Sequence, residues 1–168
     1  MIEIQAFSDQ QVKEAKKKLA QGIDKFQQSN VLIVGDLCVD EYLLGDVTRI
    51  SPEAPVPVVD VKSQEQRLGL AAYVAQNVKT LGGQCHLLGV VGNDATSADL
   101  RKMLKEAQLS EDHLVVDGQR PTTRKTRIMT GNHHITRVDF ERRQFLRDEI
   151  EQELLDRAFS LMKDANIV

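Results

Sequence analysis

The sequence predicts an α/β fold, in which helices cover both faces of a parallel sheet and a small second β-layer is added. Two short apolar runs bounded by glycine, "VLIVGDLCVD" and "CHLLGVVG", are typical of strands buried on both faces of a parallel sheet. Segments with helical spacing of apolar residues alternate with these runs, which implies that helices pack on the sheet. Residues 41–66 and 120–140 break the alternation and are expected to form the second layer.

The first element is predicted to be an amphipathic helix that begins near Ser8. A glutamine three residues after this serine completes a capping-box pattern. Apolar residues then recur at three- and four-residue spacing, at Val12, Ala15, Leu19, Ile23 and Phe26. The apolar run that follows is predicted to be a buried strand that ends at Gly35 and Asp36.

Residues 41–66 contain two strand-like stretches separated by "SPEAP". Pro52, Pro55 and Pro57 forbid a helix there and disfavour a central strand. An edge position or a small separate sheet is therefore expected.

A helix is predicted over 71–81, with Gly82 and Gly83 as its C-terminal stop. Its predicted apolar face consists of Ala71, Val74, Ala75, Val78 and Leu81. After the second buried strand, "NDATSADLRKMLKEAQ" is predicted to be a helix and "HLVVDG" a short strand.

The last third of the chain is predicted to contain a hairpin, a helix and the start of a strand. "TRKTRIMTGNHHITRVDFE" indicates two strands around the turn "TGN". The helix that follows has Asp148 and Glu151 as a second capping pattern. The final "NIV" is typical of the first residues of another strand.

Composition excludes several classes of protein. A net charge of -3 and a pI near 5.8 give no general attraction to nucleic acid or anionic membranes. The apolar runs are shorter than the roughly 20 residues of a membrane span, and the N-terminus has no signal-peptide pattern. Cys38 and Cys85 lie in strand-like runs, which favours buried thiols over a disulfide and a reducing, cytoplasmic location.

Few residues carry an obvious chemistry. The sequence has no P-loop, no G-x-G-x-x-G fingerprint and no Cys/His zinc spacing. His133 and His134 are adjacent in a predicted strand, so they point to opposite faces and cannot hold one metal together. No metal site and no catalytic residue is therefore predicted.

Two aspartates and a basic segment are the candidate ligand-binding residues. Asp36 and Asp40 follow a buried strand, where they suit hydrogen bonds from sugar hydroxyls and equally suit capping of a turn. The segment from Arg120 to Arg147 suits a solvated β-face or a phosphate-contacting face, since arginine binds phosphate bidentately. Nucleic acid is disfavoured, because only Phe140 and Phe145 interleave with the basic residues.

Three stretches together carry a family resemblance: "VLIVGDLCVDEYLLGDVTRISPEAPVPVV", "RLGLAAYVAQNVKTLGGQCHLLGVVGND" and "TTRKTRIMTGNHHITRVDFE". They resemble the ribokinase-like (PfkB) carbohydrate kinases, and in particular their heptose-7-phosphate kinase branch in bacterial ADP-heptose and lipopolysaccharide synthesis. "RISPEAPVPVV" and "RVDFE" are specific to that branch. The resemblance covers about residues 30–168, in order and without large gaps.

The resemblance implies a doubly wound sheet with a β-lid from residues 41–66 and 120–140, which often mediates dimerisation. It implies phosphoryl transfer from ATP, with Mg²⁺, to the anomeric position of a heptose 7-phosphate. Asp40 matches the sugar-contacting aspartate, and Gly69 with Ala71 matches the glycine-rich sugar-binding motif. Lys125, Arg127 and Arg137 are expected on lid strands near the sugar phosphate.

Two departures from the family pattern change the expectation. Family members are about twice as long, and residues 1–168 correspond to the N-terminal part of one kinase domain, without the nucleotide-binding half. The chain alone is therefore expected to be inactive and to bind ATP and Mg²⁺ poorly. The family's sugar-binding asparagine is replaced by Tyr73, and Leu70 stands where the family has a second glycine. The alternative is a non-catalytic module that self-associates through the lid and half sheet.

Overall fold

A computed structural model describes residues 8–168, except for the side chain of Asp24. The elements in chain order are α1 (Asp9–Lys25), a 3-10 turn (Phe26–Gln28), β1 (Asn30–Val34), β2 (Leu37–Ile50), β3 (Pro57–Gly69), α2 (Leu70–Thr80), β4 (Gln84–Val91), α3 (Ala95–Glu106), β5 (Leu114–Val116), β6 (Thr123–Thr130), β7 (His133–Phe140) and α4 (Asp148–Leu161).

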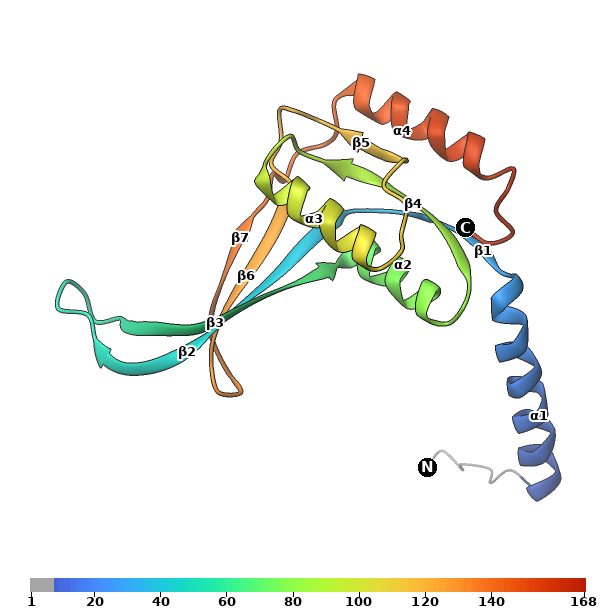
Figure 1. Cartoon of the computed structure of the whole chain (residues 1–168), viewed down its shortest axis with the longest axis horizontal. Coiled ribbons are helices and arrows are strands. Elements are labelled where there is room, and N and C mark those ends of the chain that lie inside the picture. The colour runs from blue at the N-terminus through green and yellow to red at the C-terminus, as the bar shows by residue number, and fades with distance from the viewer. Residues whose placement is uncertain (1–7) are drawn as a thin grey trace, which may run out of the picture.

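The strands form two sheets that share no strand. The first is parallel, with the order β1-β4-β5, and the second, which we call the lid, has the order β3-β2-β6-β7. The chain first passes from one sheet to the other at Gly35 and Asp36, between the end of β1 and the start of β2. Figure 1 shows the β2–β3 hairpin as a long arm that extends away from the helices.

Helices cover both faces of the parallel sheet, as the sequence predicts. Leu87 of β4 packs in one cluster with Ala72 of α2 and Leu100 of α3. Leu88, the next residue, packs in a second cluster with Ile150 of α4. Successive residues of a strand point to opposite faces, so β4 is buried on both sides, and the predicted α/β class is confirmed.

The second predicted segment of the second layer, residues 120–140, contains β6 and β7, but the first, residues 41–66, is several residues too short at both ends. The lid begins at Leu37 rather than residue 41, and β3 continues to Gly69 rather than residue 66. Asp40 therefore lies inside a paired strand, opposite Arg67 and Lys125, and not in a turn after β1. The sequence does not reveal this because the apolar run continues unbroken through the change of sheet.

Two details of the predicted helices are also wrong. In α2, Val74 and Leu81 are exposed, whereas Ala75 is buried as predicted and Ala72 is buried as well, since small side chains let the helix approach the sheet closely. In α4, Arg147 and not Asp148 occupies the N-cap position, without a side-chain cap. Asp148 lies in the first turn, where a carboxylate interacts favourably with the helix dipole.

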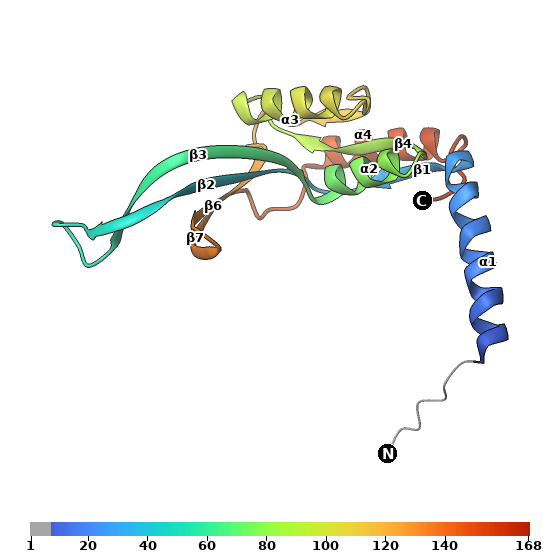
Figure 2. The same cartoon turned by 60° about the horizontal axis from the view of Figure 1, so that its bottom comes forward.

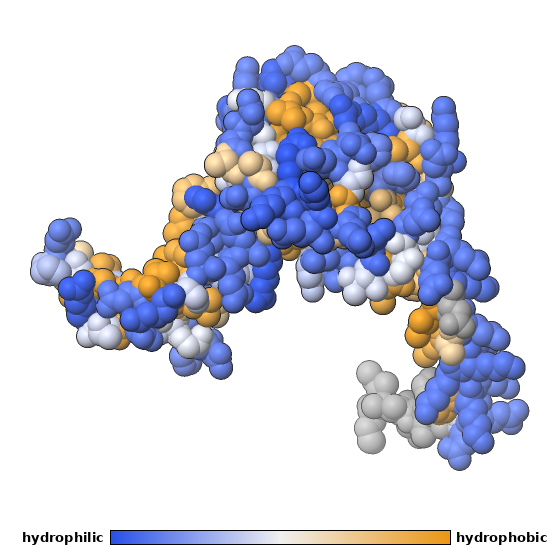
Figure 3. Space-filling model, viewed as in Figure 1, coloured by the Kyte–Doolittle hydropathy of each residue, from blue (hydrophilic) through white to orange (hydrophobic). Residues whose placement is uncertain are grey.

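The first helix, α1, forms as predicted and stands apart from the sheets (Figure 2). The Ser8 hydroxyl accepts a hydrogen bond from the backbone N–H of Gln11, and the Gln11 side chain accepts one from Ser8, which confirms the capping box. Its apolar face is exposed, as is a set of apolar residues on the β2–β3 arm. The exposed apolar residues of the arm are Val47, Ile50, Val56 and Val61, and Figure 3 shows hydrophobic surface along it.

Residues near the C-terminus lie beside β1. Ile167 forms a parallel bridge with Val31, and its carbonyl accepts a hydrogen bond of 2.8 Å from Leu32 N–H, in agreement with the strand predicted from "NIV". Cys38 and Cys85 are free thiols, and Cys38 is fully buried. No helix among the described residues is both long and apolar enough to cross a membrane.

A buried carboxylate, Glu41, connects three strands of the lid. Its oxygens accept hydrogen bonds of 2.6 Å from the Thr126 hydroxyl on β6 and 2.7 Å from the Gln64 amide on β3. Arg124 lies 3.9 Å away. Burial alone would raise the pKa of Glu41, but these hydrogen bonds and the guanidinium outweigh it and lower the pKa below its ordinary value of 4.5.

We expect Glu41→Ala to lower the free energy of unfolding at pH 7 by about 2–3 kcal/mol, because Thr126 and Gln64 then lose a charged acceptor. Urea denaturation measures the difference. Since folding lowers the pKa of Glu41, its stabilisation is present above about pH 4.5 and is lost as the pH falls through the lowered value. The difference between wild type and variant should therefore shrink in acid.

Glu65→Ala is the matched control, because Glu65 lies on β3 of the same sheet but is exposed and, within residues 8–168, paired only with Arg67. Its loss should change stability by at most about 0.5 kcal/mol. Equal effects of the two substitutions at pH 7 would contradict the role assigned to Glu41.

Candidate functional site

Two rows of opposed residues cross one face of the lid. The first contains Arg67, Asp40, Lys125 and Asp139, and the second contains Glu65, Tyr42, Arg127 and Arg137. Residues two apart on a strand point to the same face, so both rows share one surface. Four predicted site residues, Asp40, Lys125, Arg127 and Arg137, therefore lie together.

Asp40 is held in place by one cation and one glycine. Its Oδ1 accepts a hydrogen bond of 2.5 Å from Arg127 Nη1, and this guanidinium also lies 5.2 Å from the centroid of the Tyr42 ring. A Cβ at Gly69 would lie 2.7 Å from Asp40 Oδ2, closer than real Cβ atoms come to a neighbour. Any other residue at position 69 would displace the carboxylate, so the glycine serves the site directly.

The thiol of Cys38 lies on the same face and is fully buried. Burial, together with the carboxylate of Asp40, raises the pKa of Cys38 from 9.0 to about 11. Its Sγ is 4.0 Å from Asp40 Oδ1, within reach of a weak S–H···O contact. A thiol that stays protonated at neutral pH is a neutral donor to the carboxylate.

The other two predicted cations are paired with carboxylates. Lys125 Nζ lies 3.1 Å from Glu141 and 3.6 Å from Asp139. The hydrogen bond to Glu141 is the main cause of the raised pKa of Lys125. Arg137 donates two hydrogen bonds to Asp139, at 2.8 and 3.0 Å. Lys125, Arg127 and Arg137 thus all have their charge balanced within the lid.

In the turn from Gly69 to Tyr73, position 70 has a backbone conformation that favours glycine, although the residue there is leucine. Leu70 has a φ of 52°, in the left-handed region that L-residues rarely adopt. The backbone N–H of Ala71 donates a hydrogen bond of 3.1 Å to the carbonyl of Asp36, which joins α2 to the crossing between the sheets. Leu70 is thus a strained residue at the start of α2.

Four of the predicted site residues, Asp36, Asp40, Tyr73 and Lys125, are divided between two clefts. The Asp40 cleft, of about 520 Å³, is lined by Asp40, Tyr42, Arg67, Tyr73 and Met103 among others, so Tyr73 faces the same space as Asp40. The Asp36 cleft, of about 550 Å³, is lined by Asp36, Leu70, Thr123, Lys125 and Arg142 among others. The structure does not bring Asp36 and Asp40 together. Lys125, opposite Asp40 in register, belongs to the Asp36 cleft.

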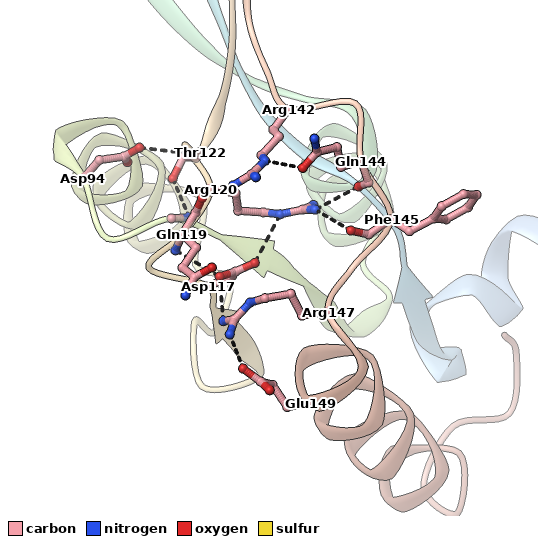
Figure 4. A network of polar contacts seen from close by, with 11 residues as sticks. Asp94, Asp117, Gln119, Arg120, Thr122, Arg142, Gln144, Phe145, Arg147 and Glu149 are labelled. Atoms are coloured by element: carbon pink, nitrogen blue, oxygen red, sulfur yellow. Dashed lines mark hydrogen bonds and ion pairs between the residues drawn. The ribbon is translucent and has the colours of Figure 1, made fainter.

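A polar network that sequence reasoning missed lies beside the Asp36 cleft, centred on Asp117 at the end of β5 (Figure 4). Asp117 accepts hydrogen bonds of 3.0 Å from Gln119 N–H and from Arg147, and lies 3.4 Å from Arg120. Burial would raise the pKa of Asp117, but these donors lower it. The sequence does contain a pattern that could have indicated this network, since Asp117 follows a buried apolar strand as Asp36 does.

Asp94, at the N-terminus of α3, likewise accepts hydrogen bonds from two segments of the chain. Its carboxylate caps the helix through Ser97 N–H at 2.8 Å and accepts a hydrogen bond of the same length from Thr122 N–H. The segment that leads into β6 is thereby fixed to the N-terminus of α3. Among the described residues, no group of three or more His, Cys, Asp and Glu side chains could hold a metal ion.

Comparison with known proteins gives consistent matches. Residues 28–164 match the pfkB family of carbohydrate kinases. The chain is 48% identical over 118 residues to D-beta-D-heptose 7-phosphate kinase of Bordetella bronchiseptica, covering 70% of this chain and 37% of that protein. It is 42% identical over 143 residues to Bifunctional protein HldE of Rhodopseudomonas palustris strain TIE-1, covering 84% of this chain and 29% of that protein. The chain thus spans only about a third of these relatives.

Solved structures agree on the fold. The chain matches fructokinase with bound ATP from Xylella fastidiosa with a TM-score of 0.56 at 20% identity, covering 79% of this chain and 39% of that one. It matches a carbohydrate kinase from Agrobacterium tumefaciens with a TM-score of 0.54 at 19% identity, covering 66% of this chain and 35% of that one. These matches place the two sheets in a ribokinase-like arrangement.

We expect Leu70→Gly to be more stable than Leu70→Ala by about 1 kcal/mol, because alanine keeps the left-handed strain and glycine removes it. This order reverses the usual one in a helix, where glycine is less stable than alanine. Thermal or urea denaturation of the two variants measures it.

Val74 provides the internal comparison, since it is exposed in the same helix. There Val74→Gly should be less stable than Val74→Ala by about 1 kcal/mol. The same order at both positions would show that Leu70 is unstrained in solution.

Proposed function

The chain belongs to the pfkB family of carbohydrate kinases, and on this premise we propose that it forms the sugar-binding and lid-bearing part of an ATP-dependent heptose 7-phosphate kinase. The observation that carries the proposal is the position of Asp40, set against Gly69 on the lid face that also bears Lys125, Arg127 and Arg137. The relatives named for heptose 7-phosphate support the choice of substrate.

In this proposal Asp40 accepts hydrogen bonds from hydroxyls of the sugar. Arg127 occupies one side of the carboxylate and fixes its orientation, so that the remaining lone pairs are directed into the cleft. Gly69 and Ala71 keep the backbone close, and Asp36 lies at the far end of the site, in the neighbouring cleft. A charged acceptor with a fixed geometry discriminates hydroxyl positions better than a mobile one.

Tyr73 alters this site in a defined way. It lines the Asp40 cleft and is about half exposed, at the position where the family motif has an asparagine. Its ring takes up space that an amide would leave to the sugar, and it offers one hydroxyl in place of two donors and an acceptor. We therefore expect weak sugar binding.

Phosphoryl transfer itself is assigned to groups other than the described residues. ATP, with Mg²⁺, would supply the transferred phosphoryl group in a protein of the relatives' full length. The described residues do not fit a magnesium site, because they contain no cluster of metal-binding side chains. The part played by residues 8–168 is to bind and orient the sugar, and to cover it with the lid.

A second candidate function is self-association through the lid. Gly45 pairs with Val61 and Val47 with Val59, so the three valines form one apolar stripe on the arm. Val47 and Val61 are exposed, with 36% and 51% of their surface accessible. A partner of the same kind would bury this stripe, and the chain would then act as a non-catalytic assembly module or as one half of a lid dimer.

We expect Asp40→Asn to weaken binding of D-β-D-heptose 7-phosphate by roughly 10- to 100-fold, because the amide loses charge and one acceptor. Isothermal titration calorimetry on the whole chain measures the change. Asp46→Asn, an exposed aspartate further along β2, removes the same charge outside the clefts and should leave binding unchanged. If wild type binds no heptose phosphate at all, the proposal fails.

For self-association we expect a dimer in size-exclusion chromatography with light scattering, and a monomer when Val47→Asp and Val61→Asp are combined. Placing charges in an apolar contact removes its burial energy and adds a desolvation cost. Val12→Asp with Leu19→Asp, on the exposed face of α1, is the matched pair and should remain dimeric. A wild-type monomer at micromolar concentration would contradict lid-mediated assembly.

A further inference from the structure

The Asp36 cleft has an excess of positive charge. Four cations line it, Arg120, Lys125, Arg142 and Arg143, against two carboxylates, Asp36 and Glu141. An adjoining hollow of about 400 Å³ shares both Arg120 and Arg142 and is lined by Val34 and Val90. The arginines thus lie at the carboxyl ends of β1 and β4, the edge at which open α/β sheets bind ligands.

Of the four cations that line the Asp36 cleft, Arg142 is the one without a carboxylate partner among the described residues. Its Nε donates to Gln144 Oε1 and its Nη1 to the Gln119 carbonyl, both at 2.6 Å. Among the described residues no carboxylate lies within 4.0 Å of it, in contrast to Lys125, Arg127 and Arg137. A guanidinium has five N–H donors, so three remain for a ligand.

Arg120 is fixed beside Arg142. Its Nη2 donates to the carbonyls of Gln144 at 3.0 Å and Phe145 at 3.4 Å, and Asp117 lies 3.4 Å from its Nε. Both arginines therefore contact Gln144, one through its backbone and one through its side chain (Figure 4). Asp117 also holds Arg147, which precedes α4, so the 141–147 segment is fixed at both ends.

We infer that Arg142, assisted by Arg120, binds the phosphate monoester of the sugar substrate in the Asp36 cleft. A phosphate dianion suits two guanidinium groups held in place, because arginine donors match its oxygens and no reorganisation is needed on binding. Arg142 differs from Arg120 and from the lid cations expected from the sequence, because each of those has a carboxylate partner. The identity of the ligand as a sugar phosphate rests on the proposed function. The binding of an anion rests on the two arginines alone.

The two clefts are placed to hold the two ends of one ligand. Lys125 lies opposite Asp40 on the adjacent strand and lines the Asp36 cleft. A sugar whose hydroxyls reach Asp40 would thus have its phosphate directed past Lys125 toward Arg142. This arrangement separates recognition of hydroxyls from recognition of the phosphate.

The test is an NMR titration of the whole chain, observing backbone amides and arginine Nε–Hε resonances. The probes are mannose 6-phosphate, mannose, inorganic phosphate and ATP. Mannose 6-phosphate should shift the Arg142 resonance, and Arg142→Gln should weaken its binding at least tenfold. Arg142→Lys, which keeps the charge, should lose less. Arg49→Gln, an exposed arginine near the tip of the arm, removes the same charge elsewhere and should bind as wild type does.

The outcomes separate this inference from the proposed function. If mannose 6-phosphate binds and Arg142→Gln leaves its affinity unchanged, the phosphate site is wrong while the sugar site stands. If Arg142 shifts but Asp40→Asn changes nothing, the phosphate site stands and the proposed sugar site fails. If ATP or inorganic phosphate shifts Arg142 and mannose 6-phosphate does so no more strongly, the assignment to the sugar phosphate is overturned.

Discussion

The passage of the chain from β1 into β2 at Gly35 and Asp36 is the constraint on which the rest of the structure depends. Only these two residues separate the end of β1 from the start of β2, so β2 must begin at the carboxyl end of β1. The hydrogen bond from Ala71 N–H to the Asp36 carbonyl then attaches α2 to the same point. Lid, helix start and strand ends therefore meet where open α/β sheets bind their ligands.

The distribution of charge on this framework is the second organising feature. On the lid face each cation of the predicted site has a carboxylate partner, and Asp40 in turn is oriented by Arg127. Such a surface suits neutral hydroxyls, which need oriented donors and acceptors but no net charge. Beside the Asp36 cleft, Asp117 and Gln144 hold Arg120 and Arg142 without balancing Arg142. In our proposal, the two clefts of different charge bind the two ends of a phosphorylated sugar.

The sequence predicts the positions of helices and strands better than the contacts between them. The strand at Gln84–Val91 and the helix at Ala95–Glu106 were predictable because glycine, apolar run and capping residue agree locally. The buried face of α2 was not, because Val74 and Ala72 both satisfy an apolar period and only the shape of the sheet selects the alanine. The separation of Asp36 from Asp40 depends on a change of sheet that leaves no mark on periodicity. The pairing of Lys125 with Glu141, and of Arg127 with Asp40, depends on strand register.

The most direct measurement of the central claim is a crystal structure of the chain grown with D-β-D-heptose 7-phosphate. The account predicts sugar hydroxyls within hydrogen-bond distance of Asp40 and the phosphate on Arg142 in the Asp36 cleft. A ligand whose hydroxyls make no contact with Asp40, with its phosphate on Arg127 or Arg137 after these have left their carboxylates, would contradict it.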